Sequence, residues 1–294
     1  MSSATSARLR LALAALLFST GGAAIKAAAF TSWQIAGFRS GIAGVVLWLL
    51  VPHARRGWTW RVFLVGVAYA ATLVLFVLAN RLTTSANTIF LQSTAPLYVL
   101  LLSPWLLREP VRPADVGFMA IVGLGLALFF VGAERPLATA PDPARGNLLA
   151  AGSGVTWALT VCGLRWMGAR EGGGSAMAAV VVGNFIAFAA ALPQALPVGP
   201  HPPGDWAVIV FLGVFQIGLA YVLVTAALRH LPALEASIIL LIEPALNPLW
   251  AWAVHGEVPG AFALAGGTII LGATTLRTWL DARGRPAAAP AGSG

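Results

Sequence analysis

Long apolar stretches, separated by short polar breaks, run through nearly the whole chain of 294 residues. About 20 apolar helical residues cross the ~30 Å hydrocarbon core of a bilayer. The pattern predicts ten such helices, at roughly 9–27, 34–52, 61–80, 84–107, 114–132, 146–167, 175–195, 206–228, 232–254 and 259–279. Proline, glycine and arginine fill several of the breaks between them, as is typical of turns. The sequence therefore predicts an all-α integral membrane protein.

The two ends of the chain depart from this pattern. Arg8 and Arg10 precede the first apolar stretch, as they would in a secretory signal. The length of the stretch, Lys26 near its end and the lack of a clear cleavage site favour a helix that is retained. Residues 283–294 are mostly Pro, Ala and Gly, which cannot pack a core, so we expect a disordered tail.

The composition supports a lipid environment. Hydrophobic residues make up 59% of the chain and charged residues 10%, which is too apolar for a soluble globule of this length. The net charge of +8 comes from basic residues in short gaps, not from a basic domain with interleaved aromatic residues. We therefore expect the lipid bilayer as a partner, and no nucleic acid.

Few residues are suited to catalysis or metal binding. Cys162 is the single cysteine, so an intrachain disulfide is impossible. The four histidines are scattered over predicted loops without the spacing of metal ligands. No nucleophile, acid–base pair or metal cluster is evident, and no phosphate-binding Gly-x-x-x-x-Gly-Lys-Ser/Thr loop occurs. We expect no catalytic residue, no metal and no cofactor.

Basic residues divide unequally between the two sides of the predicted spans. With a cytoplasmic N-terminus, the inner side holds thirteen of the 18 Lys and Arg residues: Arg8, Arg10, Arg55, Arg56, Arg61, Arg108, Arg112, Arg165, Arg170, Arg229, Arg277, Arg283 and Arg285. The outer side keeps Lys26, Arg39, Arg81, Arg135 and Arg145. Because cytoplasmic loops are enriched in Lys and Arg, both termini are predicted to be cytoplasmic.

The chain also repeats itself. Arg81, Pro96 and Glu109 recur 148 residues later as Arg229, Pro244 and Glu257. We therefore expect two copies of one unit, at 1–137 and 138–282, with five spans in each. An odd number of spans makes the copies insert with opposite orientation, and such inverted repeats build transporters that work by alternating access.

The repeated residues carry a resemblance to a known family. The second half holds Glu243-Pro244, Gly256-Glu257, Gly266-Gly267 and Gly272, and the first half holds Phe38-Arg39, Pro96, Glu109, Gly117 and Gly123. Over roughly residues 8–280 this pattern resembles the EamA-type ten-helix exporters of the drug/metabolite transporter superfamily. Among these, the chain is most similar to the YddG-type aromatic amino acid exporters of bacterial inner membranes.

The resemblance implies an architecture and an activity. Helices 1–4 and 6–9 would surround a central cavity, helices 5 and 10 would lie at the periphery, and small metabolites would be exported. The two halves differ beside their prolines, since Ala95 in the first half corresponds to Glu243 in the second. The halves are therefore not chemically interchangeable.

Polar residues in the fourth predicted span are candidates for substrate binding. A polar side chain in hydrocarbon is costly unless it faces a cavity or a partner. Pro96 removes a backbone donor and frees a carbonyl group near Gln92. The candidates are Asn87, Gln92, Thr94 and Tyr98. In the alternative interpretation, Thr94 bonds its own helix and Pro96 only bends it.

Glu243 and Asn247 are candidates in the ninth predicted span. Four residues apart, they lie about 40° apart on one helix face. Glu243 is near mid-span and is our candidate for proton coupling or for binding a substrate amine. The alternative is a structural carboxylate beside the helix breaks at Pro244 and Pro248. Glu235 is interpreted as a first-turn residue at the helix N-terminus.

Cations and aromatic side chains supply further candidates. Lys26 or Arg39 is able to pair with a substrate carboxylate, but we favour exposure of Lys26 at the outer interface and a structural role for Arg39. Trp157 and Tyr221 lie deep in their predicted spans and are candidates for an aromatic pocket wall. Lipid contact is the alternative for Trp157.

These observations favour a secondary active exporter. We expect it to move small metabolites, with aromatic or other hydrophobic amino acids as the leading substrates, across the cell inner membrane by alternating access. The alternatives are export of a different small metabolite or a cationic drug, a passive channel, or a membrane enzyme. A monomer is the expectation for the oligomeric state.

Overall fold

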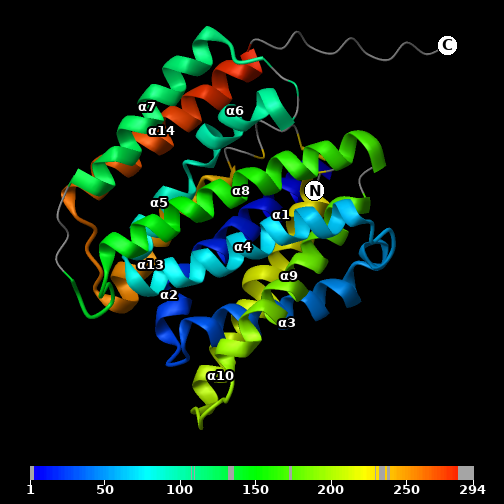
Figure 1. Cartoon of the computed structure of the whole chain (residues 1–294), viewed down its shortest axis with the longest axis vertical. Coiled ribbons are helices and arrows are strands. Elements are labelled where there is room, and N and C mark those ends of the chain that lie inside the picture. The colour runs from blue at the N-terminus through cyan, green and yellow to red at the C-terminus, as the bar shows by residue number, and fades with distance from the viewer. Residues whose placement is uncertain are drawn as a thin grey trace.

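The computed structural model describes residues 3–106, 108, 110–131, 136–171, 174–228, 230–231, 236 and 239–283. These residues form helices and no β-strand (Figure 1). Within them, nine segments are long and apolar enough to cross a membrane. This agrees with the predicted all-α membrane protein.

The helices follow the predicted spans closely. In residues 1–137 they are α1 Ser3–Ser19, α2 Gly21–Ala27, α3 Ser32–Leu50, the short 3₁₀ helix η1 Pro52–Arg55, α4 Trp60–Leu82, α5 Ser85–Gln92, α6 Ala95–Leu106 and α7 Pro113–Val131. In the remainder they are α8 Pro143–Glu171, α9 Gly174–Ala195, α10 Pro203–Phe211, the π-helix η2 Leu212–Leu219, α11 Ala220–Leu228, α13 Ile242–His255 and α14 Ala261–Arg283.

Several predicted spans are interrupted rather than continuous. The first breaks at Thr20, between α1 and α2, and the fourth breaks at Ser93 and Thr94, between α5 and α6. The Ser93 hydroxyl donates to Ile89 O at 2.7 Å, and the Thr94 hydroxyl donates to Leu91 O at 2.6 Å. Pro96, two residues further on, has no N–H to continue the helical bonding. Local polar groups and a missing donor thus explain this break.

Part of the ninth predicted span lies outside the described residues. Residues 236, 239 and 240 are helical, helix α13 runs from Ile242 to His255, and Glu235 is among the residues without a description. The helix ends at Gly256, whose φ of +66° suits a left-handed C-terminal glycine. The predicted tail beyond Arg283, together with Glu109, Arg135 and Arg229, also falls outside the described part of the chain.

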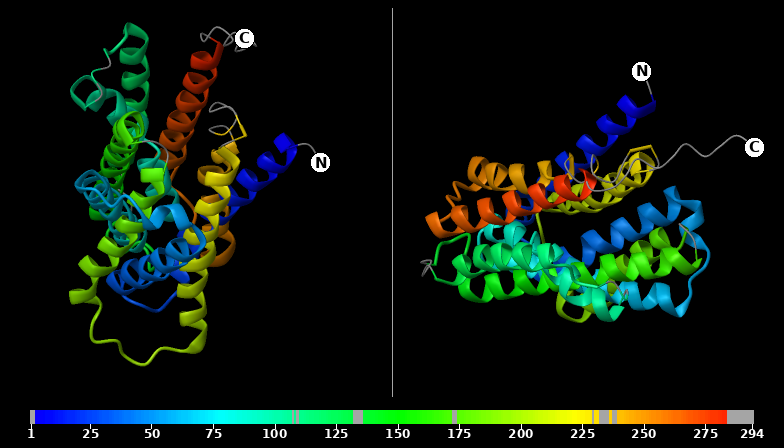
Figure 2. Two further views of the ribbon diagram at one scale, coloured as in Figure 1. Left: turned by 90° about the vertical axis from the view of Figure 1, so that its right-hand side faces the viewer. Right: turned by 90° about the horizontal axis from the view of Figure 1, so that it is seen from above.

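Small residues allow the central helices to pack closely. A Cβ on Gly183 of α9 would lie 2.7 Å from Tyr69 Cδ1 and 2.8 Å from Gly66 O, both on α4. Contact at this distance leaves no room for a larger side chain. Helices α3 and α9 also pack together, and α1 lies beside α11 (Figure 2).

Helices α7 and α14 form a separate pair at one end of the molecule (Figure 1). Their apolar windows are 28% and 22% buried inside the protein, the lowest shares among the candidate spans. Gly125 of α7 contacts Gly266 of α14, and Arg277 of α14 forms an ion pair with Asp115 of α7. Low burial agrees with the peripheral position that the resemblance implies for helices 5 and 10.

Candidate functional site

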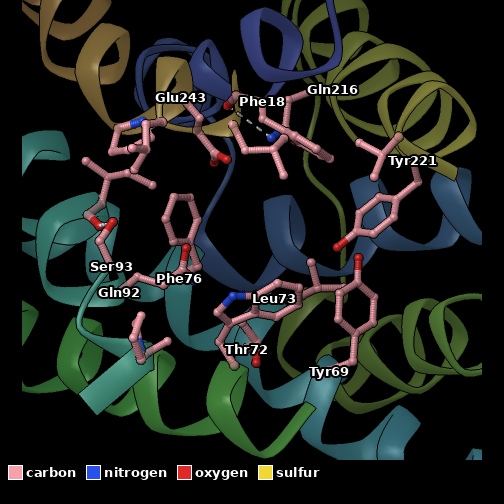
Figure 3. Close-up of a pocket in the computed structure, with 18 of the residues that line it drawn as sticks. Phe18, Tyr69, Thr72, Leu73, Phe76, Gln92, Ser93, Gln216, Tyr221 and Glu243 are labelled. Carbon is pink, nitrogen blue, oxygen red and sulfur yellow. Dashed lines mark hydrogen bonds between the residues drawn. The ribbon is translucent and has the colours of Figure 1, made fainter. Parts of the chain in front are cut away.

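A cavity of about 370 Å³ lies among helices from both halves of the chain. Its polar lining includes Arg39, Tyr69, Thr72, Gln92, Ser93, Gln216, Tyr221, Glu243 and Thr274, and its aromatic lining includes Phe18, Phe76 and Trp157. Figure 3 shows most of these side chains pointing into one space. The volume falls in the range of ligand pockets for small molecules.

The interrupted helices border this cavity. Phe18 precedes the break at Thr20, Ser93 lies in the break between α5 and α6, and Gln216 lies in the π-helix η2. Glu243 is in the first turn of α13. Discontinuous helices near the middle of the membrane are where transporters place their substrates, because free backbone groups and polar side chains meet there.

Four of the predicted substrate-binding residues line the cavity. They are Gln92, Trp157, Tyr221 and Glu243. Gln92 Nε2 donates to Ser153 Oγ on α8 at 3.3 Å, which orients the amide at the cavity wall. The Glu243 carboxylate points into the space (Figure 3), and no hydrogen bond or ion pair connects it to another described residue.

The other four predicted residues lie outside the cavity lining. Asn87 Nδ2 donates to Thr83 Oγ1 at 3.2 Å and to Asn147 Oδ1 at 3.0 Å, so its amide joins helices within the protein. The Thr94 hydroxyl donates to Leu91 O in the same span, as the alternative interpretation expected. Tyr98 packs beside Gly154 of α8.

Asn247 is the fourth of these residues. Its side chain is fully buried, and a Cβ placed on Gly22 of α2 would lie 2.7 Å from Asn247 Oδ1. Ser85 of α5 lies against the same glycine. Although Asn247 and Glu243 were expected on a shared face, Asn247 faces the contact between α2 and α5, one turn further along α13 and outside the cavity lining.

Arg39 is a cavity residue for which the sequence favoured a purely structural role. Its side chain is 2% exposed, and Nη2 donates to Leu73 O at 3.1 Å. Its Nε has no hydrogen-bond partner among the described residues. The cost of a cation inside a span could have marked Arg39 as functional, since such residues usually face a cavity.

Tyr69 and Gln216 also line the cavity, and the sequence analysis did not identify them as candidates. The ring of Tyr69 meets that of Tyr221 edge to face, with centroids 5.9 Å apart, and their hydroxyl groups point toward each other (Figure 3). Gln216 Nε2 donates weakly to Phe18 O at 3.4 Å, and its Oε1 is unpartnered in the described structure. A lone amide in the apolar span 206–228 was an available signal for Gln216.

Lys26 is buried in an ion pair rather than exposed, and this corrects the sequence-based interpretation. Its side chain forms an ion pair with Glu257, and the two side chains are 3% and 2% exposed. Lys26 Nζ also donates to Thr83 O at 2.8 Å and to Thr139 O. An acidic partner far along the chain, invisible to local patterns, removes the need to reach water.

Comparisons with known proteins find relatives in sequence and a similar fold. Two relatives, both named pseudopaline exporter CntI, come from Pseudomonas aeruginosa strains UCBPP-PA14 and PAO1. Each is 28% identical to this chain over 273 residues, covering 88% of this chain and 91% of the relative. A solved structure covers 95% of this chain and 98% of its own, with a TM-score of 0.61 and 23% identity, which supports the fold alone.

A family model assigns the chain to a protein family. The model of the EamA-like transporter family matches residues 6–131 and again residues 144–279. The two segments together cover most of the chain, and each includes helices that line the cavity. The chain therefore belongs to the EamA-like transporter family.

Proposed function

We propose that this protein is a secondary active exporter of small metabolites, with aromatic or other hydrophobic amino acids as its leading substrates. The observation that carries the proposal is the cavity, whose walls combine aromatic rings with the carboxylate of Glu243. Family membership and the exporter names of the relatives support export of a small molecule. The long apolar helices support a multi-pass protein in the bilayer, which we assign to the cell inner membrane.

Two inverted five-helix repeats with cytoplasmic termini form part of the proposal. The excess of basic residues on one side supports this orientation. This orientation puts four residues at the outer side of the membrane: Ala23, Lys26, Ser85 and Glu257. There Ser85 N donates to Glu257 Oε2 at 2.9 Å, and His255 Nε2 lies 2.8 Å from Ala23 O.

These contacts form what we call the outer closure, defined by the Lys26–Glu257 ion pair and the contacts of Ala23 with His255 and of Ser85 with Glu257. The outer closure joins the first half of the chain to the second. In alternating access, release of substrate outside requires these contacts to separate while the inner side closes.

Proton exchange through Glu243 is the proposed coupling mechanism. A protonated carboxyl group cannot pair with a cationic substrate, so proton and substrate would compete for the same group. The charged or titratable groups that share the cavity are Arg39 from α3, Tyr69 from α4 and Tyr221 from α11. No other carboxylate is among the described residues that line it.

The names of the relatives favour one alternative substrate. They are pseudopaline exporters, so a different small metabolite is the second candidate for this chain. A channel or a membrane enzyme would differ in the assay below, since neither produces saturable exchange.

Counterflow in proteoliposomes tests the proposal. Unlabelled phenylalanine, leucine or pseudopaline inside the vesicles should drive uptake of the same labelled compound, because a carrier exchanges substrate across the membrane. Protein-free vesicles are the control. Exchange of pseudopaline alone would exclude amino acids, whereas flux that never saturates would indicate a channel. Chemical conversion of the compound by the purified protein would indicate an enzyme.

A further inference from the structure

The cavity contains a basic and an acidic side chain that do not pair with each other. Arg39 comes from α3 in the first half, and Glu243 comes from α13 in the second. No ion pair within 4.0 Å joins them in the described structure. An uncompensated charge in a low-dielectric interior is costly, so each is expected to meet a partner during the transport cycle.

Arg39 has unused capacity for hydrogen bonding. A guanidinium group carries five N–H donors in a planar fork, and Leu73 O accepts from one of them. Its Nε has no partner in the described part of the chain, although the side chain is 2% exposed. Because two parallel N–H groups match the two oxygens of a carboxylate, Arg39 is suited to an anionic end of a ligand.

Glu243 has the complementary capacity. Its carboxylate faces the cavity (Figure 3) and, unlike Glu257, forms no ion pair with a described residue. An ionised carboxylate only accepts hydrogen bonds, so an ammonium group is a suitable partner. Gln216 lies nearby in the same lining, and its unpartnered Oε1 offers a second acceptor for an amine.

The remaining wall is largely apolar or aromatic. Tyr69, Phe76, Trp157 and Tyr221 line the cavity with Leu73. Aromatic faces suit a hydrophobic body, and their negative potential tolerates a nearby cation. The lining therefore offers one anion-binding group, one cation-binding group and an apolar surface.

We propose that the substrates are zwitterions with a hydrophobic body, bound with the carboxylate at Arg39 and the amine at Glu243. This inference rests on the proposed export function and names the class of substrate and the group that each residue recognises. Each half of the protein supplies one charge, so a bound zwitterion compensates both halves at once. A ligand with one charge leaves the opposite group uncompensated and is discriminated against.

Matched compounds test this class of substrate. The first set is phenylalanine, phenethylamine and 3-phenylpropionate, and the second is leucine, 3-methylbutylamine and 4-methylpentanoate. Counterflow should be at least about tenfold faster for zwitterions than for their one-charge analogues, since a hydrogen bond to a charged group contributes about 1.5–3 kcal/mol. A singly charged compound that exchanges as fast as its zwitterion overturns the inference.

Substitutions test which residue recognises which group. Glu243→Gln should raise the half-saturation concentration for the zwitterion about tenfold or more and remove its advantage over the carboxylate analogue. Arg39→Gln should remove the zwitterion's advantage over the amine analogue. Arg39→Lys should restore part of that advantage. Arg145→Gln, at an exposed position, is the charge-matched control. It should change neither the half-saturation concentration for the zwitterion nor the zwitterion's advantage over its analogues. Unfolding temperature and gel-filtration profile identify variants that fail to fold.

The outcomes separate the two proposals. Exchange limited to amines or to carboxylates would overturn the zwitterion inference and leave the export function standing. The same holds if Arg39→Lys folds but behaves like Arg39→Gln toward every analogue. If neither the panel nor pseudopaline exchanges with the folded protein, the export function fails as well.

Discussion

Lys26 and Glu257 are 231 residues apart in the chain and form an ion pair that is almost completely buried. The pair connects the end of α2 to the segment that follows α13, and Glu257 also accepts a hydrogen bond from Ser85 N at the start of α5. A carboxylate is favourable at a helix N-terminus, where backbone N–H groups lack partners. One acidic side chain therefore ties together three segments.

Removing Lys26 should destabilise the protein strongly. Lys26→Met leaves the Glu257 carboxylate buried without its cation, and loss of one partner of a buried pair costs about 3–5 kcal/mol. Thermal unfolding in detergent should show a clear fall in melting temperature. The double variant Lys26→Met, Glu257→Gln should unfold at a higher temperature than Lys26→Met alone, because no buried charge is left unpaired. Equal temperatures for the two would contradict this account of the pair.

Linking the two sides of the outer closure should stop transport. In a Cys162→Ser background, Ala23→Cys and His255→Cys place thiols on the two sides of the contact between Ala23 O and the His255 ring. A short reducible bis-thiol reagent should then block counterflow, because the outer side cannot open. Reduction should restore it.

A crosslink at the periphery is the control for this experiment. Asp115→Cys and Arg277→Cys replace the ion pair between α7 and α14, and neither residue lines the cavity. The same reagent should leave most of the counterflow of that variant. Full activity in the crosslinked Ala23, His255 variant would show that the outer closure stays shut during transport.

Glu243→Gln should abolish the pH dependence of transport while the protein remains folded. In the native protein, low pH protonates the carboxyl group and removes its attraction for a substrate amine, so the half-saturation concentration should rise as pH falls. The amide introduced by the substitution is neutral at every pH and should give a flat profile. Counterflow measured between pH 5 and 9 checks this expectation, and an unchanged pH profile in the variant would remove Glu243 from coupling.

Gly183→Ala should destabilise the contact between α4 and α9. The added methyl group would meet Tyr69 Cδ1 at 2.7 Å and Gly66 O at 2.8 Å, and overpacking of this kind costs about 1–3 kcal/mol. Because Tyr69 lines the cavity, substrate affinity should also fall. Gly272→Ala is the matched control, since nothing lies within 4 Å of the new Cβ. Its melting temperature should stay level or rise, and a fall like that of Gly183→Ala would refute the packing argument.

Some of the site was recognisable from the sequence. Glu243 and Gln92 were identifiable because polar groups in a span must face a cavity or a partner, and both line the cavity. The same rule selected Asn87 and Thr94. Asn87 satisfies it through Asn147, and Thr94 satisfies it through a backbone carbonyl of the same span. The rule says that a partner exists, but the type of partner depends on the rotation of each helix against its neighbours.

Arg39 and Lys26 show the limits of local reasoning most clearly. Both are cations near the outer ends of their predicted spans, where the sequence favoured snorkelling for Lys26 and a structural role for Arg39. The fold separates them, because Lys26 meets Glu257 while Arg39 reaches the cavity and meets Leu73 O. Partners 231 residues away cannot be found from periodicity or from distance to a span end.

By itself, the sequence determined that the chain is helical and multi-pass and where most helices begin and end. Those features depend on local quantities: the length of each apolar stretch against the thickness of a bilayer, and the turn residues between stretches. Only the tertiary structure decided where the spans break, which polar residues share the cavity and which charges pair. These depend on close packing between helices, such as Gly183 against Tyr69, which sets the rotation of every polar face.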